Sequence, residues 1–367
     1  MTTQKQTVLG LRAGEMVEVR TQGEILSTLD EHGRFENLPF MPEMLQFCGK
    51  RFRVSARADK TCDPAHIPWS LRRLTNSVHL DAVRCDGAGH GGCEAGCLMF
   101  WKEAWLRRVD PNLTQIETGS ERRVSGIQGC ASGNGSTECI MRGACTTSEA
   151  DPEPRYSCQA TELRTFTSHL PWWDVRQYVR DVTSGNLSSG LSGHSLPERF
   201  LEMILSATRV FQGLLISFFN SVQRKRRGVP FPLVEGELSK TPLEVLNLQP
   251  GELVQVKSRE EIVATLDTRS CNRGLLFDAE MLRWCGGIYR VLRRVHHIVD
   301  EKNGRMLHMK NPCIVLEGVW CRGDYHKFCQ KAIWHYWREN WLRRAGDIPM
   351  PARPEDAQAE ECESCVR

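Results

Sequence analysis

Two segments far apart in the chain carry the same arrangement of metal-binding side chains. Residues 85–93 and 321–329 each begin and end with Cys, and each has His three residues before the second Cys. Beyond that Cys, both continue as Trp-(Lys/Arg)-Glu-x-Trp-Leu-Arg-Arg, at residues 101–108 and 337–344. Thiolate sulfur and imidazole nitrogen are the donors that structural zinc prefers. The pattern predicts a metal-binding module present twice, and we call residues 85–93 the first loop and 321–329 the second loop.

The candidate ligands are mostly shared between the two modules. In the first module they are Cys48, Cys85, His90, Cys93 and Cys97, and in the second they are Cys285, Cys313, Cys321, His326 and Cys329. Three cysteines and one histidine align, so a Cys3His zinc site is the economical prediction. The fourth ligand could instead be His79 in the first module and Cys313 in the second, since residues two apart on a strand face the same way. Cys97 aligns with Ile333 and cannot serve in both.

A separate group of cysteines lies between the modules. Its members are Cys130, Cys139, Cys145 and Cys158. Four thiolates can hold zinc or an iron–sulfur cluster. Their irregular spacing in a region rich in Gly and Ser fits a loop folded around a cofactor. Zinc is the main cofactor expected for the chain, with an iron–sulfur cluster at this quartet as the alternative.

Motifs of nucleophilic catalysis and of the phosphate-binding P-loop are absent from the sequence. It contains no Gly-x-Ser-x-Gly and no His-Glu-x-x-His, and no Gly-Lys-(Ser/Thr) follows the glycines of the first loop. Glu103 and Glu339 each lie between two tryptophans and are expected to be buried carboxylates, each paired with an arginine such as Arg107 or Arg343. No reaction or substrate follows from these residues, so enzymatic activity stays open.

The similarity of the modules extends well beyond the loops. Gly14-Glu15 matches Gly251-Glu252, and Glu43-Met44-Leu45 matches Glu280-Met281-Leu282, both 237 positions apart; from Cys85 and Cys321 onward the offset is 236. This near-ungapped match indicates internal duplication. Alternating apolar and polar residues predict strands at 14–20, 52–57 and 289–295. We therefore expect an α+β protein with two small β-rich modules, each an SH3-like barrel closed by a Cys-rich loop and a Trp-rich helix.

The sequence predicts five successive segments. The first module covers residues 8–110, a Cys-containing insert 111–195, an amphipathic helix with a basic linker 196–230, and the second module 245–347, before a disordered tail at 348–367. Apolar residues recur at helical spacing over 197–223, followed by a basic run at 224–227. Such a helix either packs between the modules or lies on a membrane surface through residues 199–227.

Composition limits the functional classes. The chain has 367 residues, 16 of them Cys, and a net charge of +3, so it gives no strong nucleic-acid signal. The first residues lack the apolar stretch of a secretory signal, which points to a reducing, cytoplasmic location where thiols bind metal rather than form disulfides. We expect a metal-binding scaffold for an unidentified ligand or protein partner. The alternatives are a metalloenzyme or redox protein centred on the quartet or the first loop, and a peripheral membrane protein.

Overall fold

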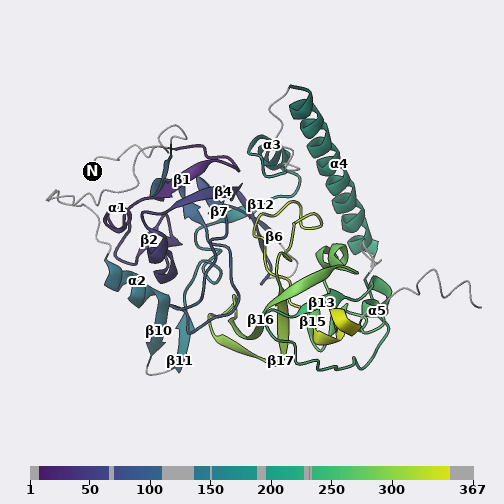
Figure 1. Cartoon of the computed structure of the whole chain (residues 1–367). Coiled ribbons are helices and arrows are strands. Elements are labelled where there is room, and N and C mark those ends of the chain that lie inside the picture. Colours follow the sequence, from purple (N-terminus) through teal and green to yellow (C-terminus); the bar gives the residue numbers. More distant parts are fainter. Residues whose placement is uncertain are drawn as a thin grey trace, which may run out of the picture. The chain divides into compact units, whose positions relative to one another are not determined.

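The computed structural model describes residues 8–65, 70–109, 136–148, 151–187, 196–226, 231 and 234–347. They form a mixed helix and sheet structure with several small antiparallel sheets (Figure 1). The chain divides into two compact units. Unit one comprises Met1–Leu233, Val295–Lys310 and Trp320–Trp334, and unit two comprises Val234–Arg294, Asn311–Val319 and His335–Arg367. Cys130 and the tail at 348–367 lie outside the described residues.

The main sheet of unit one has five strands in the order β8-β7-β4-β1-β9. Their bounds are β1 Met16–Val19, β4 Arg51–Arg57, β7 Ser77–Leu80, β8 Trp101–Lys102 and β9 Leu106–Arg108. Alternation in β1 turns Val17 and Val19 into the core, where both are fully buried. The next element, α1 (Gln22–Leu26), begins at a capping box in which Thr21 and Glu24 bond each other's backbone N–H groups. The expected strands at 14–20 and 52–57 are confirmed by β1 and β4.

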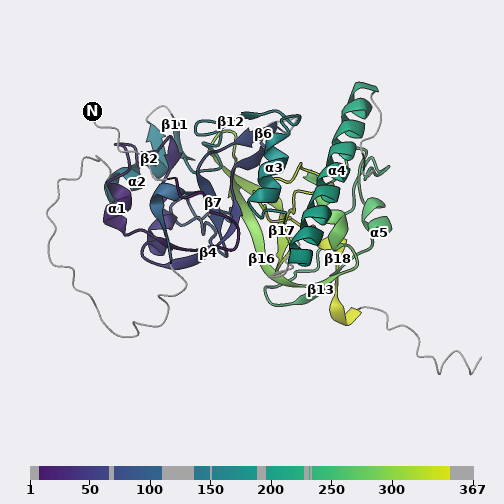
Figure 2. The same cartoon turned by 90° about the horizontal axis from the view of Figure 1, so that it is seen from above.

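Several shorter elements complete unit one. They are β2 (Arg34–Phe35), β3 (Leu38–Pro39), the 3-10 helix η1 (Pro42–Phe47), β5 (Lys60–Asp63), β6 (Ser70–Arg73), α2 (Thr137–Ala144), β10 (Cys145–Ser148), β11 (Asp151–Tyr156), β12 (Ser168–Leu170), α3 (Arg176–Thr183) and α4 (Leu196–Arg226). Strands β5, β6 and β12 form a three-stranded sheet. The long helix α4 lies beside α3 (Figure 2), and it confirms the helix expected at 197–223.

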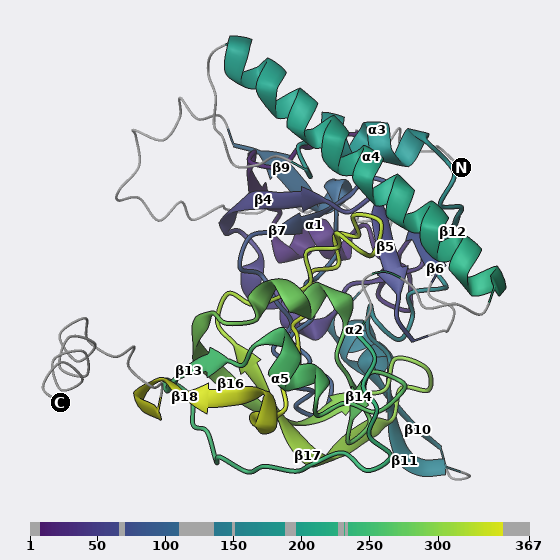
Figure 3. The ribbon, with the colours of Figure 1, turned by 90° about the vertical axis from the view of Figure 1, so that its right-hand side faces the viewer.

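Unit two is built around β13 (Leu253–Val256), with strands in the order β17-β16-β13-β18 (Figure 3). Its other elements are α5 (Arg259–Val263), β14 (Cys271–Asn272), β15 (Leu275–Leu276), the 3-10 helices η4 (Ala279–Trp284), η5 (Glu339–Trp341) and η6 (Ala345–Asp347), and the strands β16 (Ile288–Val299), β17 (Met306–Leu316) and β18 (Leu342–Arg344). The strand expected at 289–295 is confirmed by β16. Beyond residue 294, β16 runs into unit one, together with the start of β17 and the second loop.

The Trp-rich segments are not helices, and that prediction is wrong. Residues 101–108 form β8, the single 3-10 turn η2 (Glu103–Trp105) and β9. The backbone of β9 pairs with β1, with Val17 opposite Arg108, so its polar groups are satisfied in the sheet. In unit two β18 pairs with β13 in the matching register, Val254 opposite Arg344.

A buried carboxylate holds each of these turns in place. Glu103 accepts hydrogen bonds from three successive backbone N–H groups, those of residues 9–11, at 2.8–3.0 Å. Glu339 does the same for residues 246–248, at 2.9–3.2 Å. The arginine partners are Arg57 at 2.8 Å and Arg294 at 2.7 Å, in place of the expected Arg107 and Arg343. These contacts are structural, because the oxygens of both carboxylates accept hydrogen bonds from the backbone and from an arginine.

Candidate metal centre

The first loop is a tight turn closed by backbone hydrogen bonds. His90 N and Gly92 N both donate to Gly87 O at 2.9 Å, and Cys93 N donates to His90 O at 3.2 Å. Gly87 has φ of +75°, and a Cβ there would lie 2.0 Å from Cys93 O. Only glycine fits this position. The turn thus fixes where Cys85, His90 and Cys93 stand relative to one another.

The second loop has the same bonds at matching positions. His326 N and Phe328 N donate to Gly323 O at 3.0 and 2.7 Å, and Cys329 N donates to His326 O at 3.3 Å. Gly323 has φ of +74°. Lys327 and Phe328 have φ of 57° and 60° where the first loop has glycines. Left-handed backbone costs about 1–2 kcal/mol for such residues, so the second loop keeps this conformation against local preference.

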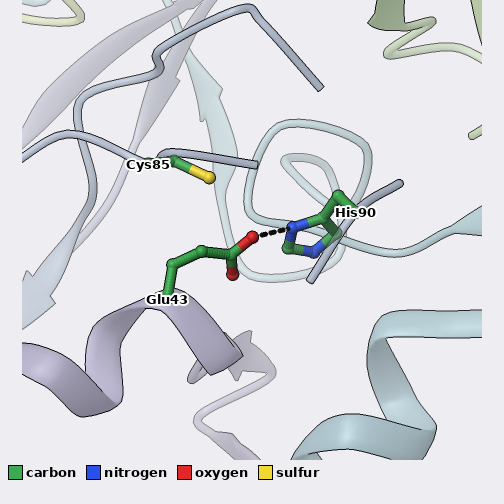
Figure 4. A group of neighbouring side chains, drawn as sticks. All are labelled: Glu43, Cys85 and His90. Atoms are coloured by element: carbon green, nitrogen blue, oxygen red, sulfur yellow. Dashed lines mark hydrogen bonds and ion pairs between the residues drawn. The ribbon is translucent and has the colours of Figure 1, made fainter. Parts of the chain in front are cut away.

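Glu43, Cys85 and His90 bring three potential ligand atoms within 4.8 Å of one another (Figure 4). Glu43 lies on η1, and its side chain is completely buried. Its Oε1 lies 2.6 Å from His90 Nδ1 and accepts a hydrogen bond from Gly89 N at 3.0 Å. Its Oε2 is buried and has no hydrogen-bond partner among the described residues. A buried carboxylate oxygen without a hydrogen-bond donor is costly, and a cation bound beside Cys85 and His90 would stabilise it.

The histidine ring is oriented by a backbone carbonyl. His90 Nε2 lies 3.2 Å from Ser157 O, which can only accept, so Nε2 carries a proton. Nδ1 then faces Glu43 and Cys85 (Figure 4). A carbonyl on the outer nitrogen is the usual way in which proteins fix the tautomer of a metal-binding histidine.

The charges of this group are interdependent. Burial raises the pKa of Glu43, but the hydrogen bond and charge of His90 outweigh burial and leave that pKa below its usual value. Burial, and then the Glu43 carboxylate, raise the pKa of the Cys85 thiol well above its usual value. A metal ion at this place would displace the thiol proton, as thiolate ligation requires.

A small cavity of about 30 Å³ lies next to this group and is lined by four thiols and His90. The four are Cys85, Cys93, Cys97 and Cys158. Burial raises the pKa of Cys97 to about 12 and that of Cys158 to about 11. A water molecule needs about 10–15 Å³ of such space, so the cavity has room for an ion. The structure therefore brings Cys158 to the first loop, while Cys139, at the start of α2, and Cys145, at the start of β10, do not line the cavity.

Four other candidate ligands lie elsewhere. Cys48 and Cys285 follow η1 and η4 and pack against the cores of units one and two. Cys313 is buried in unit two, 3.5 Å from Arg338 Nη1. His79 is buried in β7, where its Nδ1 donates to Met99 O at 2.9 Å, and burial lowers its pKa to about 4.

The second loop gathers a different set of thiols. Cys321 Sγ lies 3.4 Å from His326 Nδ1. Cys329 Sγ accepts hydrogen bonds from the backbone N–H groups of Cys62 at 3.0 Å and Lys331 at 3.4 Å. Burial raises the pKa of Cys329, but the Cys62 thiol hydrogen bond and the Lys331 N–H outweigh burial and lower it to about 6.

Two residues of these groups were missed from the sequence. Glu43 belongs to the repeated Glu-Met-Leu sequence, which was a usable signal. Cys62 has no cysteine counterpart, because position 299 is Val, so no signal pointed to it. No cysteine in the described part of the chain forms a disulfide.

Comparison with known proteins adds no relative. No protein-family model, curated protein or solved structure matches this chain. Among the described helices, none has the length and hydropathy to cross a membrane.

Proposed function

We propose that this chain is a zinc-type metal-binding protein that acts as a binding or scaffold module, with its first centre at Glu43, Cys85 and His90. The buried Glu43 Oε2, with no hydrogen-bond donor among the described residues and with Cys85 and His90 beside it, carries the proposal. A mixed thiolate, imidazole and carboxylate set suits zinc better than magnesium or calcium, which prefer oxygen ligands.

The required movement is small. Zinc binds nitrogen and oxygen at about 2.0 Å, so tetrahedral coordination would open the contact between His90 Nδ1 and Glu43 Oε1 to about 3.3 Å. That contact is 2.6 Å in the structure. The thiols that line the neighbouring cavity offer a fourth ligand, in a compartment that keeps them reduced, for which we propose the cytoplasm.

Elemental analysis of full-length variants tests this proposal. Glu43→Gln and Cys85→Ser should each lose one zinc per chain relative to the wild type. Cys48→Ser should lose none, because Cys48 packs in the core away from the ligand group. A Cys85→Ser protein with wild-type zinc content would refute the first centre.

We also propose that the two modules arose by internal duplication and that each is an SH3-like barrel. The matching loop hydrogen bonds and the matching anchors at Glu103 and Glu339 support the duplication. The shared order β1, α1, η1, β4, η2, β9 and β13, α5, η4, β16, η5, β18 supports it as well.

One observation favours a redox centre as the second candidate. Four thiols around one cavity match the ligand number of an iron–sulfur cluster. This would place the cluster at the first loop with Cys158. Anaerobically purified protein with visible absorbance, iron and sulfide would favour this candidate, and colourless protein with zinc would exclude it.

Helix α4 favours a third candidate, a peripheral membrane protein. Ile204, Phe211, Leu215 and Phe218 follow one face and are 44–62% exposed, and the exposed Lys225 and Arg226 follow them. An apolar face with a basic end is typical of helices on anionic membrane surfaces. Co-sedimentation with phosphatidylserine vesicles that is lost in Phe211→Ser/Phe218→Ser would support this candidate, and no sedimentation would exclude it.

A further inference from the structure

The thiol of Cys62 is buried against the second loop. Cys62 belongs to β5 of the first module, and Cys329 is the last residue of the second loop; both belong to unit one. The Cys62 thiol is hydrogen-bonded to Cys329, and the Cys62 backbone N–H donates to the same sulfur at 3.0 Å. Cys321 Sγ lies 3.4 Å from His326 Nδ1, and the same loop turns at His326 O, which accepts a hydrogen bond from Cys329 N at 3.3 Å.

We propose that Cys62, Cys321, His326 and Cys329 form a second zinc site, a Cys3His set with ligands from both modules. This site is independent of the first centre and shares no ligand with it. The sequence pattern predicted Cys285 as its third cysteine, but Cys285 packs against the core of unit two.

The chemistry of the set fits a structural zinc ion. Three thiolates and one imidazole are a standard closed coordination shell for zinc. Cys62, Cys321 and Cys329 are 4, 8 and 3% exposed, so the metal would be shielded from water. Two backbone N–H groups already point at Cys329 Sγ, and such donors stabilise a ligating thiolate.

A comparison with the first loop shows why Cys62 matters. Val299 occupies the position that matches Cys62, and its backbone N–H donates to Cys93 Sγ at 3.2 Å. The same strand position therefore meets the last cysteine of each loop, but only one of the two offers a thiol. The first loop has Cys97 and Cys158 beside it instead. A zinc ion at the second loop would fasten β5 to residues 321–329, which are about 260 positions further along the chain.

The test is zinc reconstitution of the full-length protein under anaerobic conditions. Chelator-treated protein is titrated with Zn²⁺, and with Co²⁺ for its visible spectrum. Cys62→Ser should lose one zinc per chain or weaken one site at least about tenfold, a loss seen even for outer-shell changes. Cys271→Ser is the matched thiol control, because Cys271 lies in β14 of unit two. Its zinc content should equal that of the wild type.

The Cys62→His variant distinguishes the loss of a zinc ligand from a folding defect. Histidine is a zinc ligand, so this variant should keep the metal while its Co²⁺ thiolate charge-transfer band weakens, as three thiolates become two. Cys85→Ser should leave the second site filled, which separates failure here from failure of the first centre. The proposal is overturned if Cys62→Ser matches the wild type in zinc content and Co²⁺ spectrum, or if freshly purified protein contains a Cys62–Cys329 disulfide and no zinc.

Discussion

The first and second loops share a backbone conformation but gather different thiols. Gly87 and Gly323 accept the same hydrogen bonds, and each loop places His three residues before its last Cys. The thiols of Cys97 and Cys158 lie beside the first loop, and the thiol of Cys62 lies beside the second. The turn therefore fixes two or three ligands, and the segments packed against it decide which set is completed.

Replacement of Gly87, two residues after Cys85, should have the largest effect on stability. Gly87→Ala places a Cβ 2.0 Å from Cys93 O and imposes positive φ on alanine, so the free energy of unfolding should fall by about 3 kcal/mol or more. Gly323→Ala, at 2.4 Å from Cys329 O, should behave alike. Urea denaturation and zinc affinity measure both effects.

Gly318→Ala is the control for these variants. Gly318 also has positive φ, at +73°, but nothing lies within 4 Å of its added Cβ. The loss there should be only about 1 kcal/mol. Equal losses at Gly87 and Gly318 would mean that the turn is not sterically required.

Low pH should destabilise the first module through protonation of His79. Burial, and then the charge of Arg84, hold its pKa at about 4 against 6.5 in the unfolded chain. The unfolded state binds the proton more readily between these values, so the stabilisation is complete above pH 6.5 and is lost as pH falls toward 4. The total is about 3 kcal/mol.

His79→Val tests this by copying the second module, which has Val315 at the matching position. The difference in unfolding free energy between pH 7 and pH 4 should shrink by that amount in the variant. An unchanged pH dependence would show that other groups cause the acid sensitivity.

The smallest effect should come from the strained residues of the second loop. Lys327→Gly relieves a φ of 57° and should raise the free energy of unfolding by about 1 kcal/mol. The opposite change can be made in the first loop at Gly92, the counterpart of Phe328: Gly92→Ala should lower the free energy of unfolding by a similar amount, since only His297 Nε2 approaches its Cβ, at 3.6 Å. Thermal denaturation of both variants should therefore give shifts of opposite sign, and shifts of the same sign would contradict the shared backbone.

Local patterns predicted the local elements well. Alternation gave β1, β4 and β16, and helical spacing gave α4, because each pattern reports one buried face. The Trp-rich segments misled, because tryptophans four apart, as at Trp101 and Trp105, suit a helix face as well as two buried positions flanking a turn.

The ligand sets were predicted only within each loop. Cys85, His90 and Cys93 are close in sequence, so their spacing carried information. Cys158 and Cys62 reach the loops from distant segments, and single-sequence patterns do not encode such long-range packing. Glu43 was repeated as Glu280, yet a carboxylate is too common in proteins to stand out as a ligand.

Zinc X-ray absorption on the Cys62→Ser protein tests the first centre most directly, because that variant should retain zinc only there. We predict a mixed first shell, with sulfur at about 2.3 Å and nitrogen or oxygen at about 2.0 Å. Glu43→Gln in the same background should lose the metal. A shell without sulfur, or a Cys62→Ser protein that retains no zinc, would contradict a centre built from Glu43, Cys85 and His90.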